Sequence, residues 1–248
     1  MKQKKLSSFY FLSRVHPIER CSKFRLVEEP IFGSLKLDIW LDGFHLWISS
    51  TKKDFSELNP LAKNILDTFL ASYAILTNIS LSYTRLGWVE VRGSRVREAI
   101  IGTIDSKYGL FKPPRKCSAN SNLKYAAKIT REAIKSVHHR MALKDYKTAL
   151  SDGGDDAFLF AFRSLESLCR AVIRSGGKVE KAEWKRMHHE LGTSDRRIMP
   201  LNNVANLVRH GRTTSKKLKK ARKNRARYLS IARNIILLEI KRSFPRES

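Results

Sequence analysis

The sequence predicts an α+β fold, in which a small β-rich N-terminal domain is followed by an all-α helical bundle. Three observations support this prediction. A β-hairpin signal surrounds Asp42-Gly43, and Lys112-Pro113-Pro114-Arg115 interrupts regular structure. Beyond that break, apolar residues recur almost everywhere with helical spacing. We therefore expect a β-rich domain with one packing helix over residues 1–112, and a helical domain with a basic last helix over residues 118–248.

The hairpin is predicted from alternation on both sides of a two-residue turn. Residues 35–41 and 44–48 alternate apolar and polar side chains around Asp42-Gly43. A turn at those two residues places Leu41 opposite Phe44 and, at the far end, Leu37 opposite Ile48. The apolar residues then share one face of the hairpin.

One helix and one further strand complete the N-terminal part. Asn59 is suited to cap a helix and Pro60 to its first position, and apolar residues then recur with helical period up to Leu76. Residues 80–92 follow the pattern of a strand, in which Gly87 marks a β-bulge.

Helices are predicted for most of the remaining chain. The expected segments are residues 123–150, 156–173, 179–191, 196–210 and 214–243. Gly176-Gly177 follows the second of them, as expected at a helix end.

Charge is the most informative feature of the composition. The chain of 248 residues has 49 Lys and Arg against 23 Asp and Glu, a formal net charge of +26. Nucleic acid is the usual partner of such an excess, because bound phosphates release counterions; an anionic membrane surface is the second reading. The three cysteines match no metal or disulfide spacing, and no apolar stretch is long enough for a transmembrane helix. We expect a cytoplasmic protein that is not bound to a membrane.

The positive charge is concentrated near the C-terminus. Between Asp195 and Glu239 there is no acidic residue, and like charges on one helix repel each other unless an anionic partner compensates them. Phosphate contact is the simplest compensation. The residues predicted to bind nucleic acid are Arg212, Lys216, Lys217, Lys219, Lys220, Arg222, Lys223, Arg225 and Arg227.

A histidine lies at the predicted end of the 196–210 helix. His210 precedes Gly211, a residue suited to follow a helix, and Asn206 lies four residues earlier on the same face. One interpretation is a histidine favoured by the helix dipole. The other is an acid or base beside the phosphate-binding side chains of Arg209 and Arg212.

Two segments resemble the HEPN superfamily of helical-bundle RNases and RNA-binding domains. They are Phe162-Arg163-Ser-Leu-Glu166-Ser-Leu168 and Ala205-Asn206-Leu-Val-Arg-His210-Gly211. The resemblance covers roughly residues 125–244. It is greatest to a branch of uncharacterised bacterial proteins with a β-rich N-terminal region.

The resemblance implies a site for RNA cleavage without a metal. His210 matches the family's histidine, Asn206 its polar residue and Glu166 its helix glutamate, whose simplest role is to orient or pair with Arg163. Ala205 stands where the family has its phosphate-binding arginine, so the motif is degenerate, and Arg209 or Arg212 is the nearby candidate to replace it. The resemblance is also consistent with a homodimer, since bundles of this family often pair.

The sequence therefore predicts an RNA-binding protein, with metal-independent endoribonuclease activity centred on His210 as the reaction to test. The expected catalytic residues are His210, Asn206, Arg209 and Glu166, and neither a cofactor nor a metal is expected. The alternative is a non-catalytic nucleic-acid-binding or complex-assembly module that keeps a degenerate HEPN motif.

Overall fold

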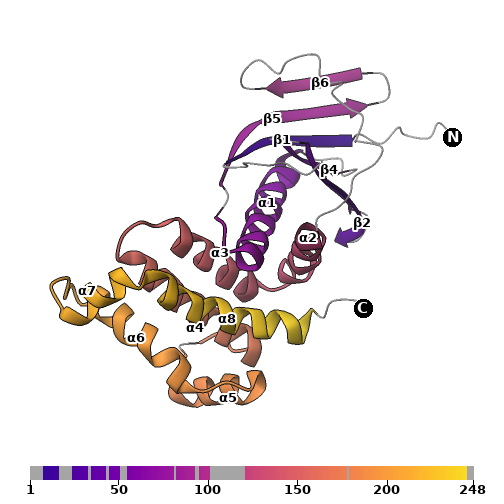
Figure 1. The fold of residues 1–248 in the computed structure, drawn as a ribbon. Helices are drawn as coiled ribbons and strands as arrows, with labels where there is room; N and C mark the ends of the chain where they lie inside the picture. The colour runs from indigo at the N-terminus through magenta and orange to yellow at the C-terminus, as the bar shows by residue number, and fades with distance from the viewer. Residues whose placement is uncertain are drawn as a thin grey trace. The chain divides into compact units, whose positions relative to one another are not determined.

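A computed structural model provides the fold. It describes residues 8–16, 24–32, 35–42, 45–50, 55–80, 82–92, 95–100, 121–177 and 179–244. The helices are α1 (Phe55–Thr77), α2 (Ser121–Ala133), α3 (Val137–Ser151), α4 (Asp156–Ile173), α5 (Lys181–Leu191), α6 (Asp195–Arg209), α7 (Lys216–Lys223) and α8 (Arg225–Ser243). The chain divides into two compact units, and α1 and α2 contribute to both (Figure 1).

The first unit contains the strands, of which the structure describes mainly the backbone path. They are β1 (Ser8–His16), β2 (Phe24–Phe32), β3 (Leu35–Asp42), β4 (His45–Ser50), β5 (Ser82–Arg92) and β6 (Arg95–Ile100). They pair in the order β2-β3-β4-β1-β5-β6, each pair antiparallel. The register of β1 against β5 shifts next to Gly87, where the sequence predicts a bulge.

The register predicted for the hairpin is wrong by two residues. β3 and β4 do pair, but Leu41 lies opposite Leu46 and Ile39 opposite Ile48. Because side chains alternate with a period of two, a shift by two residues preserves the apolar pattern, and alternation cannot distinguish the two registers.

The predicted fold class, α+β with a small β-rich N-terminal domain before an all-α bundle, is also wrong. Every buried hydrophobic residue that the structure describes lies in one of eight helices or beside a helix end. A β-rich domain with a core of its own is not part of that description. The packing of α1 explains the error: the sequence suggests a helix that covers strands, whereas residues 67–80 belong to the unit formed by residues 128–248.

The C-terminal end of α1 is fastened to this helical unit by hydrogen bonds. Arg233 donates from Nε to the carbonyl oxygen of Ile75 (2.9 Å) and from Nη2 to that of Leu76 (2.7 Å). The buried Tyr146 hydroxyl donates to Asn78 Oδ1 (2.7 Å), and burial raises the pKa of Tyr146 to about 12. The last carbonyls of α1 thereby find partners from α8.

Helix α4 is the centre of the bundle, in contact with α3, α5, α6 and α8. Phe158, Ala161, Leu165 and Leu168 are buried on it, at the spacing of one helix face. The predicted segment 156–173 is confirmed residue for residue, and the predictions for α5 and α6 are confirmed to within two residues. None of the helices in the described part of the chain combines the length and apolar character needed to cross a membrane.

Two segments predicted as single helices are each divided in two. The 123–150 segment breaks between α2 and α3, where the side chain of Ser136 accepts a hydrogen bond from the backbone N–H of His139 and caps α3. The 214–243 segment breaks at Asn224, between α7 and α8. The Lys112–Arg115 break lies outside the described residues.

Candidate nucleic-acid interface

Helix α7 is short and has two chemically distinct faces. Leu218 and Ala221 are fully buried. The opposite face consists of five exposed lysines, and no described residue pairs with their ammonium groups. They are Lys216, Lys217, Lys219, Lys220 and Lys223.

Two other cations of the predicted interface have partners inside the protein. Arg222 binds Asp155 through two hydrogen bonds (2.8 and 2.5 Å) and also donates to the carbonyl oxygen of Thr213 (3.2 Å). These bonds and the charge of Arg222 lower the pKa of Asp155. Arg225 donates to the carbonyl oxygens of Ala149 and Asp152 at the end of α3. Both arginines therefore hold α7 and the start of α8 in place.

The break at Asn224 separates the lysine-rich helix from the packed one. The Asn224 side chain donates to the carbonyl oxygen of Lys220 (2.9 Å), and its backbone N–H bonds to Ala221. Asparagine competes for backbone hydrogen bonds in this way and is a poor residue for a helix interior. Because Arg222 and Arg225 are anchored on either side, the break between α7 and α8 is held in place.

The electrostatics of α7 are unfavourable without a partner. The helix has no acidic residue in its first turn, where the helix dipole favours one. Its lysines lie three and four residues apart, at which spacing like charges destabilise a helix. An anion bound along this face would relieve both effects.

The C-terminal end of helix α6, where His210 is the C-cap residue, is capped by backbone hydrogen bonds. Gly211 adopts a left-handed conformation (φ +65°), its N–H bonds to Val208, and the N–H of Arg212 bonds to Leu207. This pattern is a Schellman motif. The cap is thus formed by the backbone, and the exposed His210 side chain is not needed for it.

The other predicted catalytic residues are partly brought together. Arg209 lies 3.9 Å from Glu166, the outer limit of an ion pair. Asn206 donates to Asn202 (3.1 Å), one turn earlier on α6. Arg163 forms two hydrogen bonds with the buried Asp145 of α3 (3.0 and 2.5 Å), and Glu166 acts on it through its charge.

Ala205, which the HEPN resemblance would align with the family's phosphate-binding arginine, is buried. Ala205 has no exposed surface and lies in the core between α6 and its neighbours. An arginine side chain would not fit there without displacing packed residues. Residue 205 is therefore part of the packing of this bundle.

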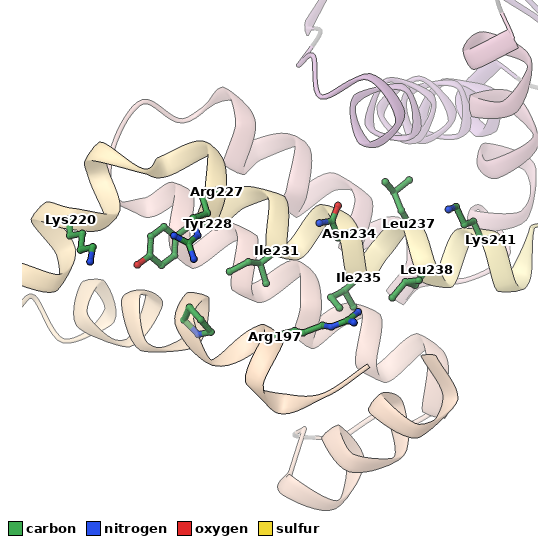
Figure 2. A pocket seen from close by; sticks show the side chains of 11 residues that line it. Arg197, Lys220, Arg227, Tyr228, Ile231, Asn234, Ile235, Leu237, Leu238 and Lys241 are labelled. Carbon is green, nitrogen blue, oxygen red and sulfur yellow. The ribbon is translucent and has the colours of Figure 1, made fainter. Parts of the chain in front are cut away.

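A groove lies between α6 and α8, with α7 at one end (Figure 2). Its volume is about 690 Å³. Arg197, Lys220, Arg227 and Lys241 contribute positive charge, and its aliphatic surface comes mainly from Ile231, Ile235 and Leu238. Sequence reasoning missed Lys241 and the role of Arg197, because the groove combines residues from three helices.

A smaller hollow of about 300 Å³ lies where α4, α5 and α6 meet. In it the Trp184 ring stacks against Phe162 and His188, and His188 Nε2 lies 2.8 Å from Asp195. His188 is buried and His189 exposed, as expected for adjacent helix residues. Within the described ranges, no three His, Cys, Asp or Glu side chains gather as a metal site would require.

The helical unit is similar to one known family. Residues 123–237 match the family described as "Domain of unknown function (DUF8168) C-terminal domain". No curated protein and no solved structure matches the chain.

Proposed function

We propose that the helical unit binds RNA through the lysine face of α7, and that it does so without cleaving the strand. The observation that carries this proposal is that the arginines and the lysines of this region differ in whether they have partners inside the protein. Arg222 and Arg225 are used internally, whereas the five lysines of α7 have no partner among the described residues. Exposed, unpaired ammonium groups on one fixed face are suited to contact phosphates.

The choice of RNA over DNA rests on the resemblance to the HEPN superfamily. The geometry supports binding more than cleavage. Ala205 is buried where the family has an arginine, and Arg209, the nearby substitute, points toward Glu166 at 3.9 Å. His210 is exposed, and among the described residues no hydrogen bond orients its ring for proton transfer.

The lysine face is tested by a fourfold substitution, Lys216, Lys217, Lys219 and Lys223 to Gln. Lys220 is kept because it also lines the groove between α6 and α8. The affinity for a labelled single-stranded RNA is measured over a range of salt concentrations. Each lost phosphate contact reduces the slope of log affinity against log salt by about 0.7, so the magnitude of the slope should fall by roughly 3.

The control removes the same amount of charge elsewhere. Lys181, Lys185, Arg186 and Arg196 are exposed on α5 and α6, and their replacement by Gln should change the slope by less than about 1. A slope near zero for the unmodified protein, or equal effects of the two variants, would show that the α7 lysines do not form the binding site.

Cleavage is tested with His210→Ala. The unmodified protein is incubated with labelled RNA in EDTA, and we expect no product ending in a 2′,3′-cyclic phosphate. The affinity of His210→Ala should stay within about twofold of the unmodified protein, since one exposed imidazole adds little to phosphate binding. A cyclic-phosphate product that disappears in the variant would establish the endoribonuclease instead.

A further inference from the structure

The groove between α6 and α8 is elongated. Its α8 residues run from Arg227 to Lys241, a rise of about 20 Å at 1.5 Å per residue. In Figure 2 the side chains of Ile231 and Leu238 extend from α8 toward α6. The groove therefore runs along α8 and is long enough for three to four turns of a second helix.

Its floor is aliphatic and has helical spacing. Ile231, Ile235 and Leu238 follow one another at i, i+4 and i+7 along α8. Ile235 is fully buried, but Ile231 and Leu238 are only half-buried. Such a stripe is the surface against which an amphipathic helix packs, and here the protein leaves part of it in contact with solvent.

The charges around this floor have one sign. Among the residues that the structure describes, Arg197, Lys220, Arg227 and Lys241 line the groove, and no carboxylate does. Within the described part of the chain, none of these four side chains forms an ion pair. Four cations beside an apolar surface favour an occupant that is both anionic and amphipathic.

The chemistry of the floor distinguishes between the anionic occupants. Single-stranded nucleic acids stack their bases on aromatic side chains. Of the described residues that line the groove, Tyr228 is the one aromatic, and its ring packs edge-on against Phe158, with 5.8 Å between centroids. A second copy of the chain is disfavoured, since each copy carries a net charge of +26.

We propose that this groove binds an acidic amphipathic helix of a partner protein. The aliphatic stripe of that helix packs on Ile231, Ile235 and Leu238, and its carboxylates pair with the surrounding cations. This interaction shares Lys220 with the proposed RNA site, whereas the other four lysines of α7 do not line the groove.

The probe is a designed helical peptide of about 16 residues, with leucines at helical spacing on one face and glutamates on the others. A scrambled peptide has the same composition without the stripe. Two adjacent arginines of α6 provide matched variants: Arg197 lines the groove, whereas the exposed Arg196 does not. Arg197→Glu and Arg196→Glu change the net charge equally, so non-specific attraction falls equally in both.

Binding is measured by fluorescence anisotropy on the full chain. Combining Arg197→Glu with Lys241→Glu should weaken binding of the striped peptide by about tenfold, which corresponds to two lost ion pairs. The control with the same change of net charge, Arg196→Glu combined with Lys185→Glu at a second exposed position outside the groove, should change it by less than about twofold. Ile231→Ala should also weaken binding, whereas Val137→Ala, at an exposed position on α3, should not. Melting curves confirm that each variant is folded, and Arg197→Gln replaces Arg197→Glu if it is not.

Two outcomes would overturn the proposal. Equal affinity for the striped and the scrambled peptide would mean that the groove recognises charge alone. Loss of oligouridylate binding in the Arg197→Glu, Lys241→Glu variant, with peptide binding unchanged, would mean that RNA occupies the groove.

Discussion

Replacement of Glu239 by alanine should lower the free energy of unfolding by about 3 kcal/mol. Glu239 is 1 % exposed and accepts hydrogen bonds from Arg242 Nε (2.8 Å) and Ser243 Oγ (2.6 Å). His139 Nε2 of α3 lies 3.2 Å from Oε1, and Arg242 also reaches Glu190 of α5 (3.5 Å). Loss of the carboxylate therefore removes a link between α3 and α8 and leaves Arg242, which also pairs with Glu190 of α5, without its buried partner.

The contribution of Glu239 should depend on pH. Burial raises the pKa of Glu239, but hydrogen bonds from His139, Arg242 and Ser243, together with the charge of Arg242, outweigh burial and lower the pKa below its ordinary value of 4.5. A lowered pKa in the folded state means that the stabilisation is fully present above that ordinary value. It is lost as pH falls through the folded-state pKa.

The measurement is urea unfolding followed by circular dichroism, at pH 7 and at a series of values below pH 5. Glu239→Gln retains some hydrogen bonds without the charge, so its deficit relative to the unmodified protein should shrink as the pH falls. Glu190→Ala is the control, because that side chain is half exposed and its loss should cost less than about 1 kcal/mol. A deficit for Glu239→Gln that does not change with pH would contradict a lowered pKa of Glu239 in the folded state.

The helices of the bundle were predictable where their signals are local. The ends of α4, α5 and α6 follow from nearby glycines, polar caps and apolar spacing, all within one helix length. The breaks at residues 134–136 and at Asn224 were not predictable. Single side chains create these breaks, and the helical spacing of apolar residues continues across them. Ser136 and Asn224 each bond the backbone of their own helix end.

The prediction of the fold class was wrong for a different reason. The sequence of α1 has the spacing of a packing helix, but the sequence does not specify its partner. That partner is set by Arg233 and Tyr146, which reach the end of α1 from positions far along the chain. Contacts of this range have no local signal.

The candidate interface was also only partly predictable from the sequence. The concentration of cations was visible in the sequence, but not which of them have internal partners. Arg222 binds Asp155, which lies 67 residues earlier in the sequence. Arg225 binds carbonyl oxygens of residues 149 and 152, which lie 76 and 73 residues earlier. Charge counts therefore predict an interface, and only the fold divides its arginines and lysines into structural and free groups.

The second large effect on stability is expected for Arg163→Met. Asp145 is 5 % exposed, and the Arg163 guanidinium is its bidentate partner across α3 and α4. Removal of the arginine leaves a carboxylate buried without a partner, which costs about 3–5 kcal/mol when both groups are enclosed. Arg163 is half exposed, so water can reach the site and we expect about 2–3 kcal/mol.

A double-mutant cycle with Asp145→Asn separates the ion pair from ordinary packing. Asp145→Asn removes the buried charge, so adding Arg163→Met to it should cost at least about 1 kcal/mol less than Arg163→Met alone. Arg196→Met, at an exposed position without an ion-pair partner among the described residues, should change the free energy of unfolding by less than about 0.5 kcal/mol. Additive effects of Asp145→Asn and Arg163→Met would show that the two side chains stabilise the bundle independently.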